Sequence, residues 1–133
     1  MFLLDTNIFL ELLLDREHAD DIERFLRTAA PGTLFLSEFS LCSIGIFLLR
    51  QKMHQEFLGM VDDLMKGGVR PVRLGPGDMR ELVKASVHYN LDFDDAYQYA
   101  VSEKCDLTIV SLDTHFDRTP RGRKAPEDIH KAP

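Results

Sequence analysis

Short apolar runs alternate along the chain with longer segments in which apolar residues recur every three or four positions. The runs have strand length and are bounded by polar or turn-forming residues, which predicts strands at 2–4, 33–36, 69–74 and 107–110. The helical spacing predicts helices that begin after Asp5 and at 20–28, 39–49, 56–66, 79–89 and 92–103. This order predicts an α/β fold, a three-layer sandwich with a mostly parallel central sheet.

Two of these segments carry further information about position. Pro71 would remove a ladder hydrogen bond, so the strand at 69–74 is expected at an edge of the sheet or to end there. The segment 39–49 is nearly all apolar and too short to span a membrane, so we expect a buried helix packed on the sheet.

Composition excludes several classes of protein without naming a function. With 133 residues, 44% of them hydrophobic and 29% charged, the chain suits one globular domain and neither a disordered nor a disulfide-stabilised protein. Cys42 and Cys105 have no metal-ligand spacing and are expected to be reduced and buried. Asp5 and Glu11 interrupt the first apolar run, so we expect no signal peptide, no membrane span and a cytoplasmic protein.

Charge is unevenly distributed along the chain. The net charge is −6, yet the stretch from Arg118 to the C-terminus holds five Lys or Arg residues against two acidic ones. We therefore expect a domain over residues 1–117 and a basic C-terminal tail over 118–133. A solvated terminus and a contact with RNA or a protein partner are both compatible with that tail.

Acidic residues follow the predicted strands. Asp5, Glu38 and Asp113 follow the first, second and fourth strands, and Asp94 and Asp95 begin the helix that leads into the fourth. Each alone suits a helix cap or a turn. Together, at the carboxyl ends of a parallel sheet, they would repel one another unless a cation binds between them. Oxygen ligands favour Mg²⁺ or Mn²⁺, and such a site suits phosphoryl transfer.

Three sequence motifs carry a resemblance to a known family. They are LDTNI at 4–8, FDDAY at 93–97 and VSLDTHF at 110–116. In order and spacing they resemble the first, third and fourth acidic motifs of PIN domains, including VapC-type toxins. The resemblance implies a Mg²⁺- or Mn²⁺-dependent endoribonuclease, often a homodimer held inactive by an antitoxin. It also implies that three acids bind the metal or act in catalysis: Asp5, Asp95 and Asp113. Three further residues would support them: Asn7, Ser111 and Asp94.

The second acidic motif departs from the family pattern. Many PIN domains carry a Glu in the helix after the second strand, where this chain has Ser43, so Glu38 is the nearest substitute as a fourth catalytic and metal-binding acid. This departure keeps a second hypothesis open, a catalytically weak PIN-like module that binds RNA or protein. His115, beside the last motif, is a candidate substrate contact. Nucleotide-binding and serine-hydrolase motifs are absent from the sequence.

Overall fold

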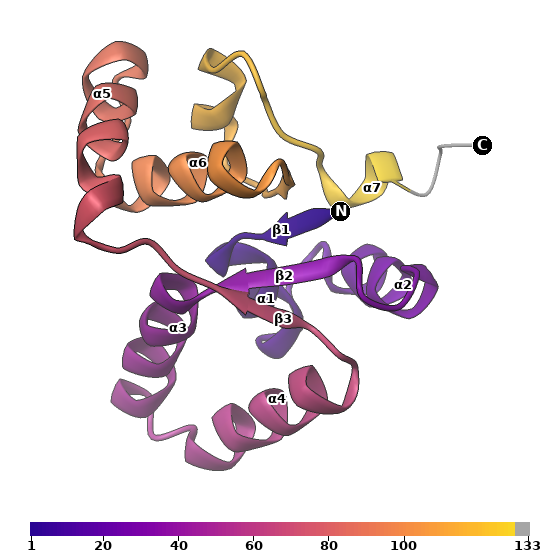
Figure 1. Ribbon diagram of the computed structural model, residues 1–133. Coiled ribbons are helices and arrows are strands. Elements are labelled where there is room, and N and C mark those ends of the chain that lie inside the picture. The colour runs from indigo at the N-terminus through magenta and orange to yellow at the C-terminus, as the bar shows by residue number, and fades with distance from the viewer. Residues whose placement is uncertain (130–133) are drawn as a thin grey trace.

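The computed structural model of the chain describes residues 1–129 and contains one parallel sheet of four strands (Figure 1). The strand order is β3-β2-β1-β4, and every neighbouring pair is parallel. The α/β prediction with a parallel central sheet is therefore confirmed. The strands are β1 Phe2–Leu4, β2 Leu34–Ser37, β3 Arg70–Val72 and β4 Thr108–Val110.

Helices connect these strands and begin or end where the polar residues predict. Asp92 caps α6 by accepting a hydrogen bond from Asp95 N, and Asn90 ends α5 in the left-handed conformation with a φ of 51°. The helices are α1 Thr6–Leu13, α2 Ala19–Thr28, α3 Glu38–Arg50, α4 His54–Lys66, α5 Met79–Tyr89, α6 Phe93–Cys105 and α7 Pro126–Ile129, with 3₁₀ turns η1 Pro76–Asp78 and η2 Thr114–Arg118.

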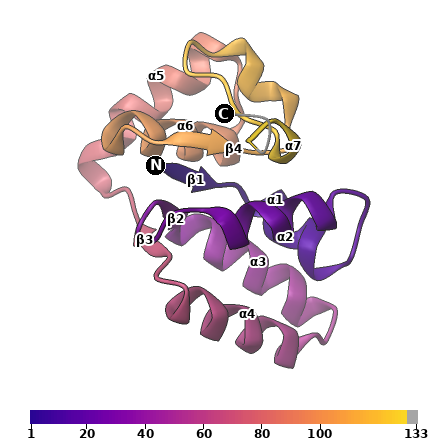
Figure 2. The same ribbon diagram turned by 90° about the vertical axis from the view of Figure 1, so that its right-hand side faces the viewer.

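The sheet is covered by helices on both faces. Neighbouring residues of a strand point to opposite faces. Leu3 accordingly packs in the hydrophobic cluster formed with α5 and α6, whereas Leu4 packs in the cluster formed with α1 to α4. Figures 1 and 2 show these two layers on either side of the strands. The three-layer arrangement follows directly from apolar strand residues that alternate between two cores.

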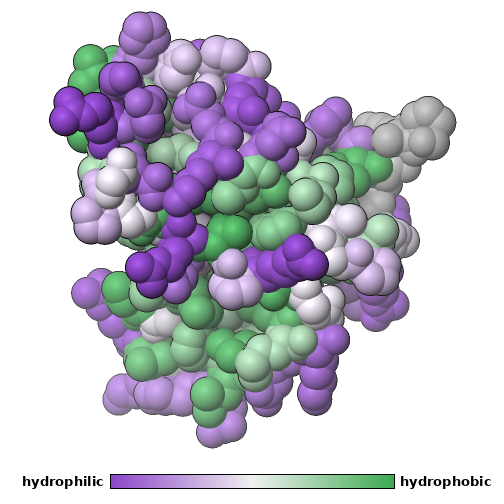
Figure 3. All heavy atoms as spheres, in the orientation of Figure 1, coloured by the Kyte–Doolittle hydropathy of each residue, from purple (hydrophilic) through white to green (hydrophobic). Residues whose placement is uncertain are grey.

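The helix α3 corrects one expectation from the sequence. It is buried along a single stripe formed by Ser40, Ile44 and Leu48, whereas Ile46 is 54% exposed and Leu49 is 47% exposed. A helix packed on a sheet beside two other helices, α1 and α4, still leaves part of its circumference exposed. Figure 3 shows hydrophobic side chains at the surface in the region of α3 and α4.

The cysteines correct another expectation. Cys42, on the outer side of α3, is exposed, and Cys105 at the end of α6 is half-buried. Both are free thiols, but burial is not the role of Cys42. By contrast, the expectation for Pro71 is confirmed, because β3 is the edge strand next to β2. Within residues 1–129, no helix is long and apolar enough to cross a membrane.

The stretch expected as a basic tail contacts the rest of the structure as far as residue 129. Lys124 forms a parallel bridge with Val110, Arg121 pairs with Asp106, and α7 packs against α2. Residues 130–133, which include Lys131, lie outside the described residues. The boundary between residues 117 and 118 remains an expectation.

The strand order places one rim of the sheet in a special position. The chain moves outward from β1 to β2 and β3, then returns to add β4 on the other side of β1. Leu4 and Val110, the last residues of β1 and β4, are partners in the register. Ligands of open α/β sheets bind outside the carboxyl ends of strands where the order reverses, so the rim between β1 and β4 is the expected ligand site.

Candidate active site

Asp5 lies directly after β1 and is held by hydrogen bonds to both of its carboxylate oxygens. Oδ1 accepts from Thr6 N at 2.8 Å and from Gln98 Nε2 at 3.0 Å, and Oδ2 accepts from Ser111 Oγ at 2.7 Å. The residue is only 7% exposed. Burial raises the pKa of Asp5, while the bonds from Gln98 and Ser111 act in the opposite direction. Asp5 is thus a buried carboxylate with a fixed orientation.

Asn7 and Ser111 connect Asp5 to the turn that follows β4. Ser111 Oγ accepts hydrogen bonds from Asn7 Nδ2 at 3.1 Å and from Asp113 N at 2.9 Å. Asn7 Oδ1 in turn accepts from Leu112 N at 3.2 Å. These contacts hold Asp113 close to Asp5. Asn7 and Ser111 thus lie beside the acids that the family resemblance implies they support.

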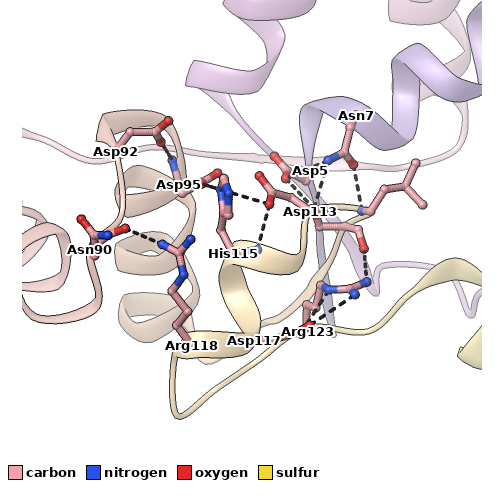
Figure 4. Close-up of polar contacts among 12 residues, drawn as sticks. Asp5, Asn7, Asn90, Asp92, Asp95, Asp113, His115, Asp117, Arg118 and Arg123 are labelled. Carbon is pink, nitrogen blue, oxygen red and sulfur yellow. Dashed lines mark hydrogen bonds and ion pairs between the residues drawn. The ribbon is translucent and has the colours of Figure 1, made fainter.

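Asp95 and Asp113 approach each other from different segments, with His115 between them (Figure 4). Asp95 lies in the first turn of α6, and Asp113 caps η2 by accepting from His115 N at 2.8 Å. His115 Nδ1 lies 3.0 Å from Asp95 Oδ2 and 3.1 Å from Asp113 Oδ1. The imidazole therefore contacts a carboxylate oxygen of each acid.

The environment of Asp95 disfavours its charged form. Burial raises the pKa of Asp95 to about 6, the hydrogen bond with His115 opposes this rise, and the negative charges of Asp113, Asp92 and Asp5 add to it. Perturbed carboxyl groups of this kind concentrate at functional sites. The three motif acids thus interact electrostatically at one rim.

Two of the residues expected at the site lie apart from this cluster. Glu38 is exposed in the first turn of α3, and within residues 1–129 no hydrogen bond or ion pair connects it with Asp5, Asp95 or Asp113. The preceding residue, Ser37, ends β2 and caps α3, so Glu38 is the first residue of the helix. Asp94 is also exposed, on the surface of the first turn of α6.

Gln98 and Ser40 belong to the site, although the sequence reading missed them. Gln98 is 2% exposed, and its Nε2 contacts both Asp5 Oδ1 and Ser40 Oγ, the latter at 2.5 Å. Thr6 Oγ1 donates to the same Ser40 oxygen at 3.0 Å. Gln98 follows Asp95 by three residues, a spacing that puts both side chains on one side of α6. This spacing could have indicated that Gln98 lies at the site. No comparable signal marks Ser40.

Comparison with known proteins identifies the family. The model of the PIN domain family matches residues 2–122, nearly the whole chain. The chain belongs to the PIN domain family. The resemblance drawn from the three acidic motifs is thereby confirmed, and it places this PIN domain in a family of nucleases. No curated protein sequence gives a significant match.

Solved structures share the fold of this PIN domain at low sequence identity. A chain of a toxin–antitoxin complex from Klebsiella pneumoniae superposes with a TM-score of 0.75 and 18% identity, over 95% of this chain and 98% of that one. VapC20 from Mycobacterium tuberculosis, a sarcin–ricin loop cleaving toxin, gives 0.73 and 17% over 85% and 90%. FitAcB from Neisseria gonorrhoeae gives 0.70 and 17% over 95% and 98%. At these identities the likeness establishes the fold.

The residues of this PIN domain fit a divalent cation. Asp95, Asp113 and His115 each offer one ligand atom, and the three atoms lie within 4.8 Å of one another. Two carboxylates at about 5 Å repel by roughly 3 kcal/mol at an effective dielectric constant near 20, and a cation bound between them removes that repulsion. Asp5 adds negative charge behind this pair without being one of the three grouped ligands.

Proposed function

We propose that this PIN domain is a metal-dependent endoribonuclease that hydrolyses RNA phosphodiester bonds with Mg²⁺ or Mn²⁺. The observation that supports the proposal most directly is the meeting of Asp95 and Asp113, from separate segments of the chain, at the rim where the strand order reverses. Acidic side chains gathered in this way cost stability unless they bind a cation.

The chain supplies three elements of such a reaction. Asp95 and Asp113 provide the carboxylates that would hold the ion, and Asp5 fixes the geometry behind them through Ser111 and Gln98. When bound, the metal would lower the pKa of a water molecule and neutralise the departing oxygen. Arg118 is exposed near the acids (Figure 4) and would provide positive charge for the RNA backbone despite the net charge of −6, whereas Arg123 is paired with Asp117.

The proposal extends to the biological setting. One structural neighbour is described as part of a toxin–antitoxin complex and another as a toxin that cleaves the sarcin–ricin loop. By analogy, we propose that this chain is the toxin of a toxin–antitoxin pair, with RNA as substrate and an antitoxin as protein partner. A homodimer in the cytoplasm is part of the same proposal.

One observation favours the alternative, a PIN-like module that binds RNA or protein and cleaves weakly. Ser43 stands where the second acid of the family is expected, and the exposed Glu38 does not contact the other acids within the described residues. On this arrangement we propose that three acids, and not four, form the site. A pure binding module, however, has no need of the electrostatic cost that Asp5, Asp95 and Asp113 impose on one another.

The test is cleavage of RNA by the purified full chain with Mg²⁺ or Mn²⁺ and with EDTA. We expect wild-type protein to cleave only with metal, and Asp95→Asn to lower the rate by about 100-fold or more, equivalent to roughly 2.7 kcal/mol of barrier. Asp20→Asn removes the same charge from the exposed first turn of α2 and should leave cleavage unchanged. Metal-independent RNA binding without cleavage would support the module instead.

A further inference from the structure

We infer that His115 is a nitrogen ligand of the metal centre and makes that centre select Mn²⁺ over Mg²⁺. This inference rests on the proposed metal dependence and adds to it the identity of the ion. It assigns to His115 a role different from the substrate contact expected from the sequence. It also makes the ligand set of this PIN domain mixed, with one imidazole in addition to carboxylate oxygens.

The distances around His115 suit a shared ion. An ion about 2.1 Å from two ligands at right angles holds those ligands about 3.0 Å apart. Nδ1 of His115 lies 3.0 Å from Asp95 Oδ2 and 3.1 Å from Asp113 Oδ1. The nitrogen thus already has the spacing from both carboxylates that adjacent positions of an octahedral ion require.

The backbone holds the imidazole in this place. Asp113 Oδ1 accepts a hydrogen bond from His115 N at 2.8 Å, and η2 begins at the next residue after Asp113. The loop that carries one carboxylate therefore also fixes the imidazole. The His115 side chain is 49% exposed, which leaves water available as the hydrogen-bond partner that a ligating imidazole needs at its other nitrogen.

The chemistry of a mixed ligand set decides between the two ions. Mg²⁺ is bound through oxygen atoms and retains several of its waters. First-row transition ions accept imidazole nitrogen more readily than Mg²⁺ does, and among them Mn²⁺ also suits carboxylate and water ligands. A site with two carboxylates and one imidazole therefore gains affinity for Mn²⁺ that it does not gain for Mg²⁺.

The alternative role for His115 is a hydrogen-bond donor that occupies the space between the two carboxylates. In that role the imidazole would move aside when an ion binds, and its removal would strengthen the binding of both ions. The two roles predict opposite changes in Mn²⁺ affinity. They also differ in whether a nitrogen atom is bonded to the ion.

Pulsed EPR of Mn²⁺ bound to the full chain distinguishes these roles, because it detects a directly coordinated ¹⁴N nucleus. We expect that coupling in wild-type protein and its loss in His115→Ala. Dissociation constants measured by calorimetry should rise at least about tenfold for Mn²⁺ in the variant and change less than about twofold for Mg²⁺. His115→Gln, which restores an oxygen, should keep the Mg²⁺ affinity and lack the nitrogen coupling.

A control is needed because His18, Asp21 and Glu127, at α2 and α7, form a second group of possible ligands. His18→Ala should leave the nitrogen coupling and both affinities unchanged. Nitrogen coupling that persists in His115→Ala, or equal changes in the two dissociation constants, would overturn the inference. If wild-type protein binds Mn²⁺ without nitrogen coupling, the ligand role of His115 is wrong but the proposed metal dependence stands. If it binds neither ion, both are wrong.

Discussion

The site has two halves that differ in how many hydrogen-bond donors surround their carboxylates. The inner half, here called the anchor network, surrounds Asp5 with donors and consists of Asp5, Thr6, Asn7, Ser40, Gln98 and Ser111. The outer half, here called the charged rim, consists of Asp95, Asp113 and His115. In the anchor network one carboxylate meets several donors. At the charged rim two carboxylates share a single imidazole.

This difference separates structure from chemistry within one site. The Asp5 carboxylate meets donors of the protein itself, so Asp5 contributes a fixed position as well as a charge. The charged rim is left with excess negative charge and therefore suits the binding of a cation. Substitutions in the anchor network should remove hydrogen bonds that stabilise the fold, whereas those at the rim should change metal binding and, through the charge of the carboxylates, the pH dependence of stability.

The largest effect on stability is expected from Gln98→Met. This change keeps the side-chain length but removes the donor to Asp5 Oδ1, a bond of 3.0 Å to a buried carboxylate. We expect the free energy of unfolding in urea to fall by about 1–3 kcal/mol. By contrast, His115→Ala at the half-exposed rim should cost about 1 kcal/mol or less.

Gln55→Met provides the matched control, because Gln55 is exposed on α4. It should change the free energy of unfolding by less than about 0.5 kcal/mol. Equal losses for the two glutamine variants would mean that the bond to Asp5 carries no stability, and the contrast between the two halves would fail.

Much of the fold could be predicted because local patterns and tertiary structure agree. The apolar strand residues, the Asp92 cap and the turn at Asn90 each follow from the chain around them. The same holds for Asp5, Asp95 and Asp113, since each is tied to the end of a strand or the start of a helix. Their convergence then follows from a parallel sheet.

The remainder of the site depends on how separate helices approach each other. Gln98 on α6 donates a hydrogen bond to Ser40 on α3, 58 residues away in sequence, and no local sequence pattern predicts that contact. Glu38 is a different case, because a strand-end rule places it at the site while the structure leaves its side chain exposed. The cap at Ser37 begins α3 one residue earlier and leaves Glu38 exposed in its first turn.

The charged rim should also make stability depend on pH in the metal-free protein. Burial raises the pKa of Asp95 to about 6, against about 3.9 in an unfolded chain. Between these values the folded protein retains a proton that the unfolded chain has released. Stability from this group is therefore lost as pH rises from about 4 to 6, and the loss persists at higher pH.

Urea unfolding in EDTA at pH 4.5 and pH 7 can isolate this contribution. Asp95→Asn cannot titrate at this position and serves as the reference. The free energy of unfolding of the wild type minus that of the variant should be lower at pH 7 than at pH 4.5. Saturating Mn²⁺ at pH 7 should stabilise the wild type and have a smaller effect on the variant. If the difference in free energy of unfolding between the two proteins stays constant across this range, the pKa of Asp95 is not raised in the folded protein.

The smallest effect is expected from Glu38→Gln, and it tests whether the site has three acids or four. Glu38 is exposed and, within residues 1–129, contacts none of the rim residues, so its charge is screened by solvent. RNA cleavage and the Mn²⁺ dissociation constant should each stay within about twofold of wild type. Ser43→Glu restores an acid at the position that the family pattern indicates, and one added charge worth about 1 kcal/mol would tighten Mn²⁺ binding roughly fivefold. A loss of cleavage in Glu38→Gln comparable to that in Asp95→Asn would instead mean that α3 rearranges to bring Glu38 to the metal, and the charged rim would then extend to a fourth acid.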